Sequence, residues 1–314
     1  MATPQSLQKG KPRMKARFVY IVAVFLFFAT VSCLTVSPGW ADGTVTECDR
    51  LAAAPHDEMR VSSGVKDAYL DIPAALAACR KAVGEHPAVP RFLFQYGRVL
   101  LFDGNPKSLE YLEKAAEQEH TLAQHVLAVA LSNGMVGVKD EMRALEWHMR
   151  AAENGAETSQ AAVGISHIQG RGVEKNLEKG IAILEKYAEE GNMLASMSLV
   201  IVYSDKDFSV FNYERTVFHL EKQVEAGMKK GKSTLGMYYV FGVGTARDTK
   251  KGVALLTERA EDGNHFAARF LATQYQNGFY LKKNEELAKY WMCRGGKLGL
   301  EILKEDYGED ATCP

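Results

Sequence analysis

Cysteine and histidine are the residues of this chain whose side chains could take part in chemistry, and their number and spacing indicate which kind. Four of the five cysteines lie outside an apolar stretch near the N-terminus: Cys48, Cys79, Cys293 and Cys313. An even number of cysteines predicts two disulfides if the protein folds in an oxidising compartment, and buried free thiols are the alternative. No two have the C-x-x-C spacing of a zinc or redox site, so we expect them to stabilise the fold.

The eight histidines do not form a recognisable catalytic or metal-binding motif. None belongs to an H-E-x-x-H sequence, and the glycine loops at Gly170-Arg171-Gly172 and Gly242-Val243-Gly244 lack the Lys-Ser/Thr that follows a phosphate-binding loop. An enzyme would need a nucleophile, a base and an orienting group that converge in one cleft. We therefore predict a protein that is not an enzyme and that binds no metal or cofactor.

The first 41 residues differ in composition from the rest of the chain. Residues 1–17 contain five basic and no acidic side chains, and residues 18–34 are almost entirely apolar. This pattern predicts a secretory signal peptide over residues 1–41, with an uncleaved inner-membrane anchor as the alternative. Cys33 is a poor candidate for lipid modification, because Thr30 stands where a lipobox requires Leu. In either case we expect the rest of the protein to be exported.

The charge of the exported part argues against nucleic acid as a partner. The chain has 38 Lys and Arg against 39 Asp and Glu, and the signal peptide removes five of the basic residues and none of the acidic ones. The remaining net charge of −6 does not suit a phosphate backbone. A membrane is expected to contact the protein only through the N-terminal segment, if that segment stays uncleaved.

A period of 36 residues organises most of the remaining sequence. Three columns of equivalent residues keep this spacing: Gly155, Gly191, Gly227, Gly263 and Gly299; Leu127, Val163, Leu199, Leu235 and Leu271; and Asp140, Asn176, Asn212, Asp248 and Asn284. Several columns that share one period identify an internal repeat.

Each repeat unit has the pattern of two helices joined by a loop. Apolar residues recur every three or four positions, as in Ile181, Leu184 and Ala188, which is the period of a helix with one buried face. The Asp/Asn column predicts helix N-caps, and the glycine column predicts left-handed helix ends. Stacked units of this kind form an all-α, right-handed α-solenoid.

The array is predicted to cover residues 91–299, between an N-terminal helical cap at 42–90 and a C-terminal capping tail at 300–314. Within the cap we expect a short helix over residues 48–54 and a longer one over residues 72–83, which Gly84 and Pro87 would end.

Particular residues of the array also match a known repeat. They are Gly170-Arg171-Gly172-Val173, Gly242-Val243-Gly244, Ala144 with Trp147, Ala151-Ala152 with Gly155, and Ala288 with Trp291. At these positions the chain resembles the Sel1-like repeat (SLR) family, a relative of tetratricopeptide repeats. The resemblance implies the solenoid fold and a role as an interaction scaffold. Trp147 and Trp291 share one column on the second helix of the unit, and we predict that both are core residues, with sugar stacking as the alternative.

A second resemblance concerns the N-terminal cap and the pairing of its cysteines. Residues 48–60, 74–83 and 90–100 resemble an N-terminal module that accompanies such repeats in exported α-proteobacterial proteins, and this resemblance implies a Cys48–Cys79 disulfide. Proximity favours the same pair together with Cys293–Cys313, because each repeat of a solenoid touches only its neighbours. Both ends of the array would then be clamped by disulfides.

One unit departs from the repeat pattern. Lys206 stands where the loop glycine is expected, and residues 205–213 replace the glycine-rich loop with an aromatic sequence. Either Phe208, Phe211 and Tyr213 pack into the neighbouring helix pair, or some of them are exposed and form a contact site.

The first helix of each unit is expected to line the concave face of the array. Seven candidate partner-binding residues lie there: His125, Val129, Ile165, Met197, Ile201, Met237 and Arg269. Their largely apolar character suits a peptide segment of a cell-envelope protein. We therefore predict a non-enzymatic periplasmic scaffold for protein–protein interaction, with secretion as an alternative location. The alternative function is a peptidoglycan- or glycan-binding module that tethers or regulates a cell-wall enzyme, which exposed aromatic rings would favour.

Overall fold

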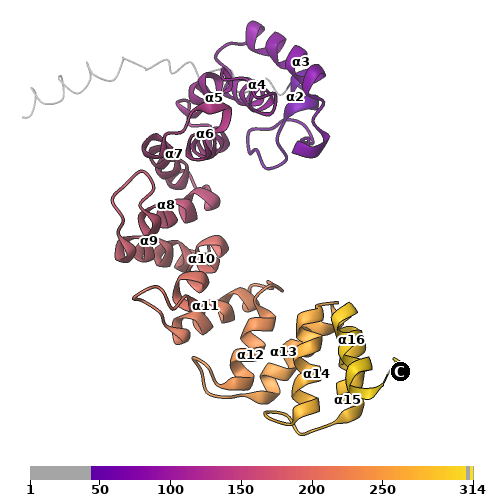
Figure 1. The fold of residues 1–314 in the computed structure, drawn as a ribbon. Coiled ribbons are helices and arrows are strands. Elements are labelled where there is room, and N and C mark those ends of the chain that lie inside the picture. The colour runs from indigo at the N-terminus through magenta and orange to yellow at the C-terminus, as the bar shows by residue number, and fades with distance from the viewer. Residues whose placement is uncertain (1–43, 309–311, 314) are drawn as a thin grey trace, which may run out of the picture. The chain divides into compact units, whose positions relative to one another are not determined.

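The computed structural model describes residues 44–308, 312 and 313, and this part of the chain contains 15 α-helices, two short 3-10 helices and no strand (Figure 1). The α-helices are α2 (Glu47–Ala52), α3 (Ile72–Glu85), α4 (Pro90–Phe102), α5 (Ser108–Ala116), α6 (Thr121–Asn133), α7 (Glu141–Glu153), α8 (Glu157–Gln169), α9 (Leu177–Glu189), α10 (Met193–Ser204), α11 (Tyr213–Glu225), α12 (Lys232–Phe241), α13 (Thr249–Glu261), α14 (His265–Asn277), α15 (Glu285–Arg294) and α16 (Gly296–Tyr307). The 3-10 helices are η1 (Asp67–Tyr69) and η2 (Met135–Gly137). The predicted signal peptide and Cys33 lie outside the described residues.

From α4 onward the helices form consecutive pairs. The most extensive contacts join α4 to α5, α6 to α7, α8 to α9, α10 to α11, α12 to α13 and α14 to α15, and each pair also packs on the next. Within the α8–α9 pair the backbones approach closely, because a Cβ added at Gly164 would lie only 2.6 Å from Leu184 Cγ. The prediction of an all-helical solenoid is confirmed.

The Asp/Asn column forms the helix N-caps that its spacing predicted. Each side chain accepts the backbone N–H three residues later, at 2.8 to 3.1 Å, in Asp140, Asn176, Asn212, Asp248 and Asn284. The backbone N–H of each cap residue also donates to a carbonyl at the end of the preceding helix, as Asn176 does to His167 (2.7 Å). These bonds satisfy donors at the helix start and hold the loop against the first helix of its own unit.

The glycine column was predicted correctly at four of its five positions. Gly155, Gly191, Gly227 and Gly263 have positive φ angles between 84° and 98° immediately after a helix. The prediction is wrong at Gly299, which lies inside α16. The last unit is shorter, since α15 ends at Arg294 and the left-handed turn falls on Gly296 (φ 70°).

A second correction concerns the helix of the cap. The sequence pattern predicted that Gly84 would help to end this helix, but α3 continues through Gly84 to Glu85. The helix ends at Glu85, and its C-cap His86, which directly precedes Pro87, has a non-helical ψ of 66°. Proline restricts the residue that precedes it away from the helical region, and this restriction sets the boundary.

Tyrosines of the first helices link consecutive repeats. The Tyr203 hydroxyl donates to Glu185 on α9 of the preceding repeat (2.6 Å), and Arg215 of α11 donates to the same carboxylate. One period later, Tyr239 donates to Glu221, whose carboxylate lies 3.6 Å from Lys251 Nζ. The hydroxyls of these two tyrosines therefore join neighbouring units.

The irregular loop of the fourth unit packs against its neighbours. Phe208 is half-buried in the cluster that contains Leu199 and Tyr203. Phe211 contacts Tyr213 edge to face with ring centroids 4.6 Å apart, and Tyr213 contacts Tyr238 of the next unit in the same way at 5.5 Å. The loop therefore adopts the packed arrangement rather than presenting fully exposed rings.

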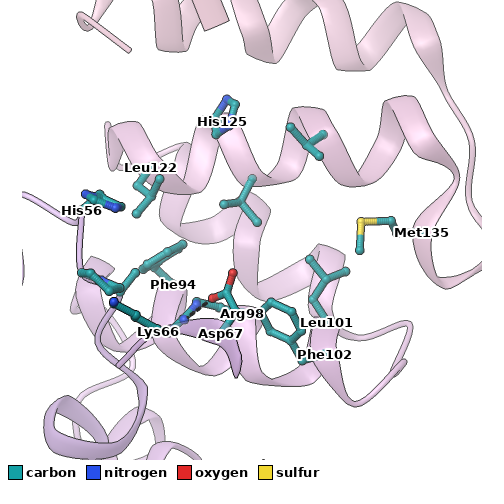
Figure 2. Close-up of a pocket in the computed structure, with 14 residues that line it drawn as sticks. His56, Lys66, Asp67, Phe94, Arg98, Leu101, Phe102, Leu122, His125 and Met135 are labelled. Atoms are coloured by element: carbon teal, nitrogen blue, oxygen red, sulfur yellow. Dashed lines mark hydrogen bonds and ion pairs between the residues drawn. The ribbon is translucent and has the colours of Figure 1, made fainter. Parts of the chain in front are cut away.

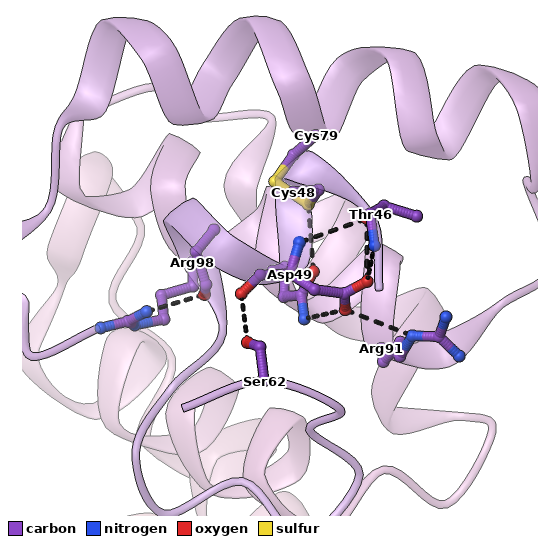
Figure 3. The surroundings of a disulfide bond; sticks show 9 residues. Thr46, Cys48, Asp49, Ser62, Cys79, Arg91 and Arg98 are labelled. Carbon is purple, nitrogen blue, oxygen red and sulfur yellow. Dashed lines mark hydrogen bonds and ion pairs between the residues drawn. A yellow bond between two sulfur atoms is a disulfide. The ribbon is translucent and has the colours of Figure 1, made fainter. Parts of the chain in front are cut away.

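Both predicted disulfides are formed. Cys48 of α2 is bonded to Cys79 of α3, with the two Cα atoms 4.6 Å apart, and Figure 3 shows this bond above the start of α4. Cys293 of α15 is bonded to Cys313, with a Cα separation of 5.6 Å. The two disulfides indicate folding in an oxidising environment. None of the helices in the described ranges is long and apolar enough to cross a membrane.

Candidate functional site

A buried polar network ties α2 to α4 (Figure 3). Asp49 of α2 is fully buried, and its carboxylate accepts hydrogen bonds from the backbone N–H of Thr46 (2.9 Å) and from Gln95 Nε2 (3.0 Å). Arg91 Nε donates to the same carboxylate at 3.3 Å. A buried carboxylate is tolerated when it is paired and hydrogen-bonded in this way, so the network sets the position of α2 on the first repeat.

Arg98 of α4 anchors the loop that connects α2 to α3, residues 53–71, which we call the cap loop. The guanidinium donates to the carbonyl oxygens of Ala52 (2.8 Å) and Val65 (2.9 Å) and pairs with the Asp67 carboxylate. The Arg98 side chain is only 4% exposed, so the array itself supplies the partner for a long irregular loop.

His120 holds the cap loop at a second point. As the N-cap of α6, its Nδ1 accepts the backbone N–H of Ala123 at 3.3 Å, so Nε2 carries the proton in the neutral ring. Nε2 faces Asp57 Oδ2 of the cap loop at 3.5 Å, and both side chains are 1% exposed. The His120 ring also packs on Phe94 of α4, with centroids 4.6 Å apart.

Beside these anchors, the cap loop leaves apolar side chains of α4 and α6 open to solvent (Figure 2). The resulting cavity has a volume of about 370 Å³, and we call it the cap groove. Its exposed apolar surface comes from Phe102 of α4 and from Leu122, Val126 and Val129 of α6, and the buried Phe94 and Leu101 of α4 also line it. Pro55, His56 and Lys66 of the cap loop also line the cavity, and Figure 2 shows His56 and Lys66 at the end away from Met135.

A second cavity of about 410 Å³ adjoins the cap groove and shares His56, Leu122 and His125 with it. This second cavity, the polar extension, lies between the cap loop and the turn that joins α7 to α8. Its lining includes Glu58 of the cap loop and Glu157 at the start of α8. The two cavities are therefore neighbours, and the lining of the second is more polar than that of the cap groove.

His125 stands at the junction of the two cavities and belongs to a buried hydrogen-bond cluster. Its Nδ1 lies 2.9 Å from the hydroxyl of Ser159, and His148 Nδ1 lies 3.1 Å from the same hydroxyl. Burial lowers the pKa of His125, and burial together with the nearby His125 lowers the pKa of His148 to about 4. Both rings are therefore neutral at pH 7. Ser159 is fully buried, so its hydroxyl is inaccessible to a substrate.

Two of the seven predicted partner-binding residues lie at the cap groove. His125 and Val129 both line the cap groove. The others lie on later helices: Ile165 on α8, Met197 and Ile201 on α10, Met237 on α12 and Arg269 on α14.

Those later residues differ in how freely they could contact a partner. Ile201 is 64% exposed, whereas Met197 and Ile165 are half-buried. Met237 packs against the C-terminal core, and Arg269 donates to the carbonyl of Gly295 at 2.9 Å. Ile201 therefore presents the largest exposed surface among them.

The sequence analysis missed the α4 side of the groove and the cap loop. A signal was nevertheless present, because every residue of 90–101 is buried in the structure although the stretch contains Arg91, Gln95 and Arg98. Polar residues at helical spacing within an apolar helix indicate that another segment covers that face. Nothing local identified the covering segment as the cap loop.

No metal site accompanies these cavities. In residues 44–308, 312 and 313, no group of three or more His, Cys, Asp or Glu side chains could hold a metal ion. Trp147 and Trp291 are 7% and 5% exposed, which confirms that they are core residues.

The repeats match a known family model. The Sel1 repeat model matches residues 93–120, 121–155, 158–192, 235–264 and 265–300, which together make up more than half of the chain. The unmatched stretch between 192 and 235 contains the irregular loop of the fourth unit. The loss of the loop glycine at Lys206 thus coincides with the gap in the family match.

The chain matches only part of the length of each relative. The chain is 25% identical over 126 residues to protein sel-1 homolog 2 of Homo sapiens, and this match covers 40% of the chain and 18% of the human protein. A solved structure of c5321, a protective antigen of uropathogenic Escherichia coli strains with an SLR fold, has a TM-score of 0.61 and 25% identity, and the match covers 77% of this chain and 53% of that chain.

A Sel1 repeat protein from Oxalobacter formigenes has a TM-score of 0.60 and 22% identity, with 76% of this chain and 71% of that chain covered. The chain therefore spans less than a fifth of the human relative and about half of the Escherichia coli protein.

Proposed function

Because this chain belongs to the Sel1 repeat family, a family of non-catalytic repeat scaffolds for protein–protein interaction, we propose that it is an exported scaffold that binds a segment of a cell-envelope protein. The observation that carries the proposal is the cap groove, in which apolar side chains of α4 and α6 line a cavity of about 370 Å³. Cavities of roughly 300–1,000 Å³ with apolar walls and a few polar groups are typical binding sites. The disulfides and the basic, apolar N-terminus support a location in the periplasm.

The proposed site begins at the cap groove and continues along the first helices of later repeats. Phe102 is 45% exposed and Met135 is 37% exposed at the groove, and Ile201 presents a further exposed apolar side chain on α10. Apolar side chains exposed next to a cavity lose unfavourable hydration when a partner covers them. No catalytic role is proposed, because the buried Ser159 cluster lacks both an accessible nucleophile and an orienting carboxylate.

Glycan binding is the less supported alternative. Sugar recognition requires exposed aromatic rings with polar neighbours. Trp147 and Trp291 are buried, and Phe208 and Tyr213 are half-buried against neighbouring helices. These four aromatic residues are therefore engaged in packing, whereas Tyr69 and Phe279 are each 77% exposed.

The test is an in-cell crosslinking pull-down of the exported protein with two matched variants. Phe102→Glu places a charge in the groove, and Phe218→Glu places one on α11 away from it; both phenylalanines are 45% exposed. A discrete envelope protein that is captured by wild type and Phe218→Glu but lost with Phe102→Glu is the expected result.

Circular dichroism must first show that both variants are folded. Equal capture by all three proteins would move the site away from the groove. Recovery of cell-wall fragments in place of a protein would support the glycan alternative.

A further inference from the structure

The cap groove and its polar extension carry opposite charges. They meet at His56, Leu122 and His125, so an elongated ligand that lies across both cavities contacts each of them. The apolar groove and the polar extension therefore define two ends of one site, and the charged residues at each end can be compared.

The groove end has an excess positive charge. The Asp67 carboxylate at this end is neutralised by its ion pair with the buried Arg98. Lys66, which also lines the groove, is exposed and has no carboxylate partner among the described residues. Its ammonium group is the one full charge in the groove lining without a partner inside the described chain.

The extension end has an excess negative charge. Glu58 and Glu157 line it, are exposed, and have no cationic partner within the described ranges. The lining contains no Lys or Arg, and its buried His120 already faces Asp57. A ligand that covers this end therefore meets two unpaired carboxylates.

From this charge distribution we infer that the site takes a peptide segment with apolar side chains at one end, an acidic group in the middle and a basic group at the other end. The acidic group would pair with Lys66, which lies on the same side of the groove as His56 (Figure 2), and the basic group with Glu58 and Glu157, while the apolar side chains cover Phe102 and Leu122. This order of apolar, positive and negative contacts sets the direction in which the segment binds and rejects segments with the reverse arrangement. The inference rests on the proposed peptide-binding function and specifies the chemistry of the partner.

The experiment is a selection from a random dodecapeptide display library on the full, disulfide-bonded protein. Wild type is compared with Lys66→Glu, with Glu58→Lys/Glu157→Lys, and with Phe102→Glu as the control that blocks the apolar contact. All the substituted residues are exposed, and the melting temperature of each variant checks that it folds. Wild type should enrich peptides in which an acidic residue lies between apolar residues and a basic one.

The variants should change one charge preference at a time. Lys66→Glu should remove the selection for the acidic residue, and Glu58→Lys/Glu157→Lys should remove the selection for the basic one. For the most enriched peptide, neutralising both of its charges should weaken binding about 2- to 30-fold, the effect of two exposed ion pairs. This difference should shrink in 1 M salt, where the screening length is about 3 Å.

The outcomes separate this inference from the proposed function. Enrichment of apolar peptides that depends on Phe102 but shows no charge pattern, or a pattern unchanged in the charge variants, overturns the inference and leaves the scaffold role standing. Absence of any enrichment over the Phe102→Glu control counts against peptide binding itself. A dimer that forms in sedimentation experiments and is abolished by Phe102→Glu would identify a second copy of the chain as the occupant and would overturn the inference.

Discussion

Replacement of Gly172 by alanine should destabilise the contact between two repeats. Gly172 lies in the loop between α8 and α9 with a φ of +68°, a region that alanine adopts unfavourably. An added Cβ would lie 2.0 Å from the carbonyl oxygen of Glu141 and 2.5 Å from its carbonyl carbon. Glu141 begins α7 of the preceding repeat, and because these are backbone atoms, the loop itself must move.

The expected magnitude is the sum of three effects. A left-handed conformation costs alanine about 1–2 kcal/mol. Alanine also lowers the conformational entropy of the unfolded chain, which stabilises the folded state by about 0.4–1 kcal/mol. The steric clash adds about 1–3 kcal/mol, as in other overpacked sites. The free energy of unfolding should therefore fall by about 1–5 kcal/mol in Gly172→Ala.

Gly191→Ala is the matched control. Gly191 also has a positive φ (+98°), but nothing lies within 4 Å of a Cβ added there. This variant shares the first two effects and lacks the clash, so it should cost about 0–1.6 kcal/mol, about 1–3 kcal/mol less than Gly172→Ala. The difference between the two variants isolates the contact between the Gly172 loop and α7.

Urea unfolding followed by circular dichroism measures both variants, and hydrogen exchange shows where protection is lost. Because repeats are coupled to their neighbours, Gly172→Ala should reduce protection in α7 and α9 before the ends of the array. Equal destabilisation by the two substitutions would refute the loop packing described here.

Three further predictions concern other contacts. Glu185→Ala should lower the free energy of unfolding by about 1–3 kcal/mol in urea titrations, because the Tyr203 hydroxyl loses its acceptor in the preceding repeat; an unchanged midpoint would show that the link is dispensable. Burial lowers the pKa of His148 and of His219 from 6.5 to about 4, so the unfolded chain binds these protons first and stability should fall as the pH drops from 6.5 to about 4. A flat melting temperature across that range would contradict their burial as neutral rings. Removal of the first disulfide, which closes 31 residues, should cost about 3–4 kcal/mol and loosen mainly α2 and α3; loss of the whole array at once would contradict nearest-neighbour coupling.

The helix boundaries were predictable wherever they depend on residues a few positions apart. Asn176 caps α9 by accepting an N–H three residues away, and Gly191 ends a helix because it tolerates a positive φ. Such effects are decided within one turn of backbone, so a 36-residue period repeats them faithfully. The prediction was wrong at Gly299 because the local sequence Gly295-Gly296 ends the preceding helix earlier.

The family resemblance could also be recognised from the sequence. The disulfide pairs were predictable too, because units that touch only their neighbours limit which cysteines can meet. The cap groove could not be predicted from the sequence in this way. It depends on the contact of Arg98 with Val65 and Asp67, more than 30 residues earlier, and on His120 facing Asp57 across the cap loop.

No periodic pattern encodes those long-range contacts, since an irregular loop takes its shape from the buried partners that it happens to reach. The sequence therefore determined the repeat, its helix caps and its disulfides, which arise from local hydrogen bonding and spacing. The tertiary structure alone decided that His125 and Val129 share a cavity with α4 and the cap loop, because that cavity exists only where distant segments pack incompletely.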